Sequence, residues 1–130
     1  WFKNGQLKSE YHYINGIEHG KRSGWHVNGL PHFVEYFNND MPHGTFKNWF
    51  ENGQLELEHN YMEGEENGIQ KTWHMNGELA NESHYKSGKL NGIMKSWNAK
   101  GVLIYESEYK KGVLLRKTCW DNLGIKIKCD

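Results

Sequence analysis

Residues 49–72 read WFENGQLELEHNYMEGEENGIQKT, and a closely similar unit recurs every 24 residues along the chain, with one residue deleted before the last copy. Each copy begins with Trp and has Gly four residues later. The six pairs are Trp1/Gly5, Trp25/Gly29, Trp49/Gly53, Trp73/Gly77, Trp97/Gly101 and Trp120/Gly124. Recurrence at a fixed period of this length is the signature of a tandem-repeat protein.

Other residue types keep the same register within the unit. Counted from the Gly, Leu recurs two residues later (Leu7, Leu55, Leu79, Leu103), Glu five later (Glu10, Glu58, Glu82, Glu106) and an aromatic residue eight later (Tyr13, Phe37, Tyr61, Tyr85, Tyr109). Further Gly residues follow at eleven and fifteen. The unit is therefore W-x-x-N-G-x-L-x-x-E-x-x-Y-x-x-G-x-x-x-G.

Two turn signals divide each unit, first Asn-Gly and then the Gly at position eleven. The arms between them have seven to nine residues, a length typical of strands and short for helices. We therefore expect an all-β, elongated single-layer antiparallel meander of tandem β-hairpins, with roughly ten strands and a length of about 50 Å at ~4.8 Å per strand. We expect residues 1–130 to form one repeat domain, with the last repeat, from about residue 120, as a truncated cap.

Residue parity predicts the faces of this sheet. Leu and Tyr lie an even number of residues apart and share a face, whereas Glu falls on the other. A three-residue Asn-Gly loop with a Gly bulge adds Trp and the Lys two residues before it to the Leu/Tyr face, and a two-residue loop adds them to the Glu face; we expect the former. The predicted structural residues are Trp25, Trp49, Trp73, Trp97, Tyr61, Tyr85 and Tyr109. The opposite face offers Glu58, Glu82 and Glu106 to a partner.

Composition limits the function. The chain is 36% hydrophobic and 14% aromatic, with a net charge of zero at pH 7, which argues against a dedicated nucleic-acid binder. Residues 1–65 carry five Lys/Arg against nine Asp/Glu and residues 66–130 carry eleven against seven, a dipole able to orient a charged partner. No apolar run approaches the ~18 residues of a membrane-spanning helix.

The second repeat departs most from the pattern. Pro31 replaces Leu, Val34 replaces Glu and Asp40 replaces Gly. Proline is tolerated only at edges or bulges of a sheet, so we expect distortion there. Exposed aromatic residues on such a stretch make good partner anchors, and this interpretation gives a binding site of Phe33, Tyr36 and Phe37. The alternative is a drifted repeat that packs its own bulky side chains.

Near the C-terminus, Arg116 stands in place of the Gly at position fifteen, and the two cysteines lie on either side of the last repeat Trp. Cys119 and Cys129 lie five residues on either side of Gly124, so a hairpin centred there places them opposite each other. A disulfide would indicate an oxidising, extracytoplasmic compartment; two reduced thiols in a cytoplasmic protein fit the sequence equally well.

Metal and catalytic motifs are not evident. The eight His residues show no H-x-x-x-H spacing, and the cysteines no C-x-x-C spacing. The four Glu copies are equivalent, whereas an active site needs one distinct pair in a cleft. We therefore expect no metal, no cofactor and no catalytic residues.

The repeat unit resembles the variant MORN repeat of bacterial proteins, including those grouped as YwqK-type antitoxins, and the resemblance covers essentially the whole chain. It implies a twisted sheet of hairpins that serves as a non-catalytic binding scaffold for another protein, in some members a toxin. The alternatives are a structural or cell-surface array, or a lipid-binding module, for which the basic C-terminal end is the only argument and membrane contact is not expected.

Overall fold

The computed structural model describes residues 1–130, which form strands, turns and loops without any helix. One antiparallel sheet of 14 strands follows the chain order from β1 to β16, and β2 and β3 form a small separate sheet. The long hairpin strands are β4 (Gly20–Trp25), β5 (Pro31–Asn38), β7 (Gly44–Trp49), β8 (Leu55–Met62), β10 (Gly68–Trp73), β11 (Leu79–Lys86), β13 (Gly92–Trp97), β14 (Leu103–Lys110) and β15 (Val113–Trp120). The two-residue strands are β1 (Ser9–Glu10), β2 (Tyr13–Ile14), β3 (Ile17–Glu18), β6 (Met41–Pro42), β9 (Glu65–Glu66), β12 (Lys89–Leu90) and β16 (Lys126–Ile127).

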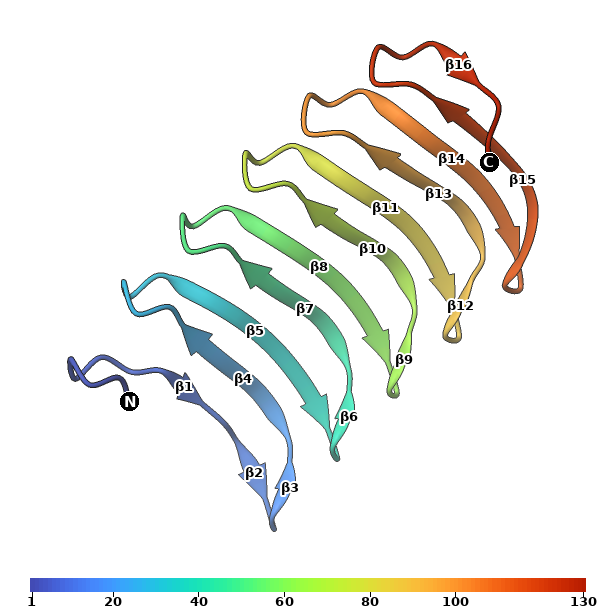
Figure 1. Ribbon diagram of the computed structural model, residues 1–130. Helices are drawn as coiled ribbons and strands as arrows, with labels where there is room; N and C mark the ends of the chain where they lie inside the picture. Colours follow the sequence, from blue (N-terminus) through green and yellow to red (C-terminus); the bar gives the residue numbers. More distant parts are fainter.

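The predicted all-β meander of repeats is confirmed. The hairpins stack side by side in chain order, so the sheet is elongated and open, and the two termini lie at its opposite ends (Figure 1). With one layer there is little interior, and only five of the 130 residues are buried.

Each Asn-Gly turn is a three-residue loop closed by a Gly bulge, as predicted. In the third repeat the Gly53 amide donates to the Phe50 carbonyl (2.9 Å) and the Phe50 amide to the Gln54 carbonyl (2.8 Å). Gly53 has a φ of 84°, in the left-handed region that favours Gly. Asn52 Oδ1 accepts from the Gln54 amide, and its Nδ2 donates to the Met75 carbonyl in the next repeat (3.0 Å). The same hydrogen bond joins Asn28 to the Glu51 carbonyl and Asn76 to the Ala99 carbonyl, so the Asn side chains connect the turns of neighbouring repeats.

The other end of each hairpin is a two-residue turn whose central residues both have positive φ, the pattern of a type I′ turn. In the second repeat Asp40 replaces Gly there with a φ of 61°, a conformation that Asp adopts more readily than most residues. In the repeat that begins at Trp97, Arg116 replaces the Gly at position fifteen, and β15 is one strand of eight residues with a bulge at Leu115.

The predicted distribution of side chains over the two faces is wrong in part. Trp49 is paired with Leu55, as the three-residue loop requires, but Lys47 is paired with Glu58, which leaves one residue of β8 unpaired between them. Such a bulge reverses the alternation of the strand beyond it. Trp, Leu, Lys and Glu therefore share one face, and Tyr61 lies on the other. The equivalent register shift recurs in the hairpins that contain β4, β10 and β13.

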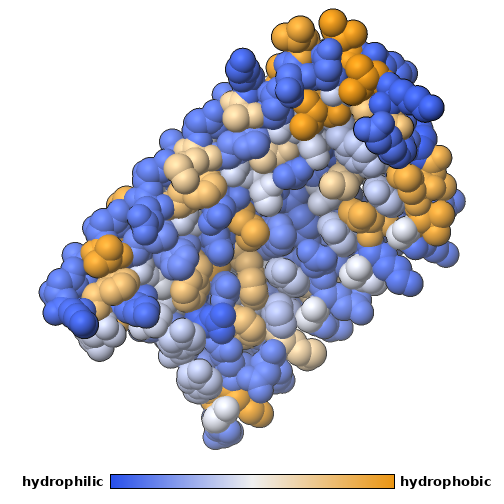
Figure 2. Space-filling view, viewed as in Figure 1, coloured by the Kyte–Doolittle hydropathy of each residue, from blue (hydrophilic) through white to orange (hydrophobic).

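The C-terminal end is closed by a short hairpin and a disulfide. β16 pairs only with Cys119 and Trp120 of β15. Cys119 and Cys129 form the disulfide, with their Cα atoms 5.3 Å apart. The prediction that the cysteines lie directly opposite each other is wrong, because Cys119 is paired with Ile127, two residues before Cys129. Apolar residues are exposed at this end (Figure 2): Val113, Leu114, Leu115, Ile125 and Ile127.

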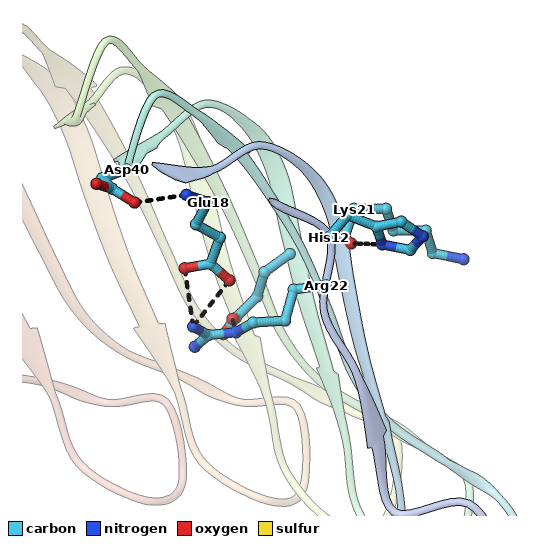
Figure 3. Close-up of polar contacts among 6 residues, drawn as sticks. His12, Glu18, Lys21, Arg22 and Asp40 are labelled. Atoms are coloured by element: carbon cyan, nitrogen blue, oxygen red, sulfur yellow. Dashed lines mark hydrogen bonds and ion pairs between the residues drawn. The ribbon is translucent and has the colours of Figure 1, made fainter. Parts of the chain in front are cut away.

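Each hairpin bends along the length of its strands in the same direction, which gives the sheet a concave and a convex face (Figure 1). We call the concave face the trough. Figure 3 shows Arg22 and Glu18 on the inner side of the curve and Lys21 on the outer side. Strand alternation therefore places two rows of side chains in the trough: Phe37, Tyr61, Tyr85 and Tyr109, and beside them Arg22, Phe46, Gln70 and Met94. Gln70 and Ser107, both in the trough, are only 3% and 1% exposed.

Candidate functional site

The N-terminal part of the trough contains a cluster of ion pairs around the partly buried side chain of Arg22. Its Nε lies 2.7 Å from a carboxylate oxygen of Glu35 on the paired strand, and its Nη1 lies 3.4 Å from Glu18. Asp40 Oδ1 accepts a 2.7 Å hydrogen bond from the backbone amide of Glu18 (Figure 3) and so fixes the backbone that carries this carboxylate. Burial alone would lower the pKa of Arg22, but Glu35 and Glu18 outweigh it and raise the pKa above its ordinary value. The guanidinium is therefore permanently charged and compensated.

Three aromatic rings surround this guanidinium. Its central carbon lies 5.0 Å from the ring centre of Phe37, 5.4 Å from Tyr11 and 5.7 Å from Phe33. These distances are within the range of cation–π attraction. The Phe33 ring lies directly over Gly24, its paired residue, where a Cβ would come within 2.2 Å of the ring. Glycine is thus required there for room.

The aromatic side chains continue along the trough into the next repeats. The Phe46 ring centre lies 5.4 Å from Phe37 and 4.7 Å from Tyr61. Tyr85 and Tyr109 follow at the register position of Tyr61, about 10 Å apart, since each repeat adds two strands. The rings are half-buried, and burial raises the pKa of both Tyr61 and Tyr85.

Glu66 lies in the middle of the trough beside these tyrosines. It is paired with Tyr61 in the register of β8 and β9, and its carboxylate is 3.8 Å from Nδ1 of His59. Burial lowers the pKa of His59, and Glu66 opposes this shift only in part. After burial, the charge of Glu66 is the largest influence that raises the pKa of Tyr61 and of Tyr85. The carboxylate therefore stands among two phenol rings and a largely neutral imidazole.

The convex face has a row of alternating charges. The ion pairs are Lys47–Glu58 (3.2 Å), Lys71–Glu82 (3.4 Å) and Lys95–Glu106 (3.6 Å). Glu58 is also paired with Lys71 in the register between repeats, and Glu82 with Lys95. The three predicted partner-binding glutamates thus lie in one row, but each faces a lysine of this chain.

The predicted aromatic anchors do not form a single patch. Phe33 and Phe37 lie in the trough against Arg22, whereas Tyr36 alternates to the convex face opposite Lys21 and is 41% exposed. The residues predicted as structural split in the same way. Trp25, Trp49, Trp73 and Trp97 lie on the convex face, and Tyr61, Tyr85 and Tyr109 in the trough; all seven are half-buried.

Sequence reasoning missed Arg22, Glu35 and Glu66. The repeat itself contained the signal for Arg22, because the equivalent positions of the next repeats hold uncharged residues (Phe46, Gln70, Met94). Contact between charges on neighbouring strands, however, depends on a register that the bulge shifts by one residue.

The described residues include no group of three or more His, Cys, Asp or Glu side chains suited to a metal ion. No helix of the protein is long and apolar enough to cross a membrane.

An open sheet of repeated hairpins with a side-chain-lined trough defines a tandem-repeat scaffold of β-hairpins. The family model described as MORN repeat variant matches residues 1–15, 42–63, 66–87 and 90–111, which together make up more than half of the chain. The chain belongs to the MORN repeat variant family. Repeats of this kind are generally associated with binding and are generally non-catalytic. The matched segments leave out residues 16–41, which contain the ion-pair cluster of Arg22. A search of curated proteins finds no match.

Proposed function

We propose that this chain is a non-catalytic protein-binding module that holds a segment of a partner protein in its trough. The observation that carries the proposal is the row of half-buried aromatic rings along a concave face that no second layer covers. An uncovered concave surface with rings and a few fixed polar groups suits a bound chain segment. The convex face is the weaker candidate because its charges are matched within the chain.

A finer form of this proposal is neutralisation of the partner, as in an antitoxin or immunity protein. It is supported by the resemblance of the repeat unit to that of YwqK-type antitoxins. In this form the trough covers a functional segment of a toxic protein. Co-expression with the partner, once crosslinking as described below has identified it, tests this role. Cells whose growth the partner inhibits should grow again when they also express the wild-type chain. Continued inhibition would reject the neutralising role and leave the binding module intact.

Site-specific photo-crosslinking tests the binding face. A photoreactive phenylalanine analogue is placed at Leu90 or Leu114, whose paired residues Tyr85 and Tyr109 lie in the trough, or at Ile69 or Tyr36 on the convex face. We expect one partner to be captured from cells through the two trough positions only, and then to bind the purified chain. Capture through the convex positions alone would contradict the proposal.

A further inference from the structure

The trough contains two related sites that differ in one respect. Glu18 and Glu66 occupy the same position of the repeat, 48 residues apart. Beside Glu18 the chain supplies its own cation, since Arg22 forms ion pairs with this carboxylate and with Glu35 between aromatic rings. The Arg22 cluster therefore shows, within this protein, how the trough accommodates a guanidinium.

The surroundings of Glu66 reproduce much of that cluster without its cation. His59 stands where the first site has Tyr11, and Tyr85 stands where it has Phe37. The position of Arg22 is taken by Gln70. Its side-chain Oε1 accepts a hydrogen bond from the backbone amide of Asn60 (2.6 Å), and its Nε2 donates one to the backbone carbonyl of Asn60 (2.9 Å). Gln70 is thus engaged with the backbone, and no Lys or Arg of the chain lies within ion-pair distance of Glu66.

The charge of Glu66 is accessible and poorly compensated. Its side chain is 31% exposed, so an incoming group can reach it. Its one ion-pair contact is His59 at 3.8 Å, and burial lowers the pKa of that imidazole. The other strand-borne glutamates of the trough, Glu18 and Glu35, are matched by Arg22. A carboxylate among aromatic rings is complementary to an organic cation.

We propose that Glu66 and the rings beside it bind an arginine side chain of the partner segment held in the trough; this inference rests on the proposed function. A guanidinium fits better than an ammonium because it bonds to a carboxylate through two N–H groups and stacks on a ring with its planar face. The partner segment is therefore a basic one, with an arginine placed at the middle of the trough.

Titration with N-acetyl-arginine amide, followed by NMR of the side-chain resonances, tests the site without the partner. We expect saturable shifts at Tyr61, Tyr85 and His59, with a dissociation constant on the order of millimolar, as for a single ion pair with stacking. N-acetyl-citrulline amide, of the same shape but uncharged, should produce no saturable shift. Equal shifts with both compounds would overturn the proposal.

Two neighbouring variants provide a matched comparison. Glu66→Gln should weaken binding of N-acetyl-arginine amide at least tenfold. Glu65→Gln, in the same strand but alternating to the other face, should leave it unchanged. Retention of binding by Glu66→Gln, or equal loss in both variants, would refute the site.

A third variant asks whether the chain can fill the site itself. Gln70→Arg places a guanidinium at the position that Arg22 holds in the first site, and it should abolish the response to N-acetyl-arginine amide. Gln70 is only 3% exposed, so the NMR spectrum of the Gln70→Arg variant must first show that its sheet is the same as in the wild type. If Gln70→Arg does not fold, Glu66→Gln and the citrulline comparison still decide the proposal.

The two proposals fail separately. If trough crosslinking captures a partner whose binding is the same in Glu66→Gln and wild type, the arginine site is wrong and the binding module stands. If N-acetyl-arginine amide binds at Glu66 but the partner crosslinks only through the convex face, the site exists and the proposed function is wrong.

Discussion

Gly24→Ala should destabilise the protein through a steric conflict with one ring. The added Cβ would lie 2.2 Å from Cε1 of Phe33 and 2.7 Å from two further ring atoms, so the ring must leave its place. Overpacking of this kind costs about 1–3 kcal/mol, and displacing the ring from Arg22 removes a further ~0.5–1 kcal/mol of cation–π attraction. Restricting the unfolded chain returns about 0.4–1 kcal/mol. The net loss is therefore about 1–3 kcal/mol.

Thermal melts followed by far-ultraviolet circular dichroism measure this loss. For a chain of this size it corresponds to a decrease in Tm of roughly 4–12 °C. The third repeat supplies the control, because its equivalent pair is Asn48 and Leu57, where a side chain is accommodated. In a Phe33→Leu background, Gly24→Ala should therefore cost less than about 0.5 kcal/mol, which corresponds to a coupling free energy between the two substitutions of at least about 0.5 kcal/mol. Equal costs in both backgrounds would refute the steric argument.

Trp73→Ala should cost about 1–3 kcal/mol in urea melts, less than the 3–5 kcal/mol typical of a fully buried large ring, because this Trp is half-exposed; a loss above 4 kcal/mol would contradict this. Replacing Cys119 and Cys129 with Ser opens a loop with a sequence separation of 10 and should remove about 2–3 kcal/mol, seen as a lower Tm and faster amide exchange in β15 and β16. Because burial lowers the pKa of His59, the unfolded chain binds a proton there first as the pH falls; the associated stability is complete above about pH 6.5 and is lost as the pH falls through the folded pKa. His59→Gln should flatten this dependence, and an unchanged slope between pH 7 and 5 would exclude His59 as its source. Small-angle scattering should give a radius of gyration of at least ~16 Å for the monomer, against ~14 Å for a compact chain of this length; the lower value would mean that the sheet is closed or folded over.

Much of the fold is predictable from local signals. An Asn-Gly pair and a second Gly, each in its own register, determine where the chain turns, and the arms of seven to nine residues have the length typical of strands. The three-residue loop closed by Gly53 and the pairing of Trp49 with Leu55 follow from that turn. These features depend on neighbours along the chain, so the sequence is sufficient to predict them.

The local signals do not determine which side chains lie on which face of the sheet. One unpaired residue in β8 moves Lys47 opposite Glu58 and sends Tyr61 to the other face. Counting residues along one strand does not reveal such a bulge. The bulge is stabilised by pairing with the adjacent strand and not by the local preference of its own residues.

The sequence by itself thus determined the repeat, the turns and an open sheet of hairpins, since these rest on conformational preferences within about ten residues. The tertiary structure alone decided which side chains meet. Arg22 reaches Glu18 and Glu35, and Glu66 lies between tyrosines of two repeats, because strand register and sheet curvature bring them to one concave face. Long-range electrostatic contacts of this kind depend on spatial distance, which spacing along the chain does not specify.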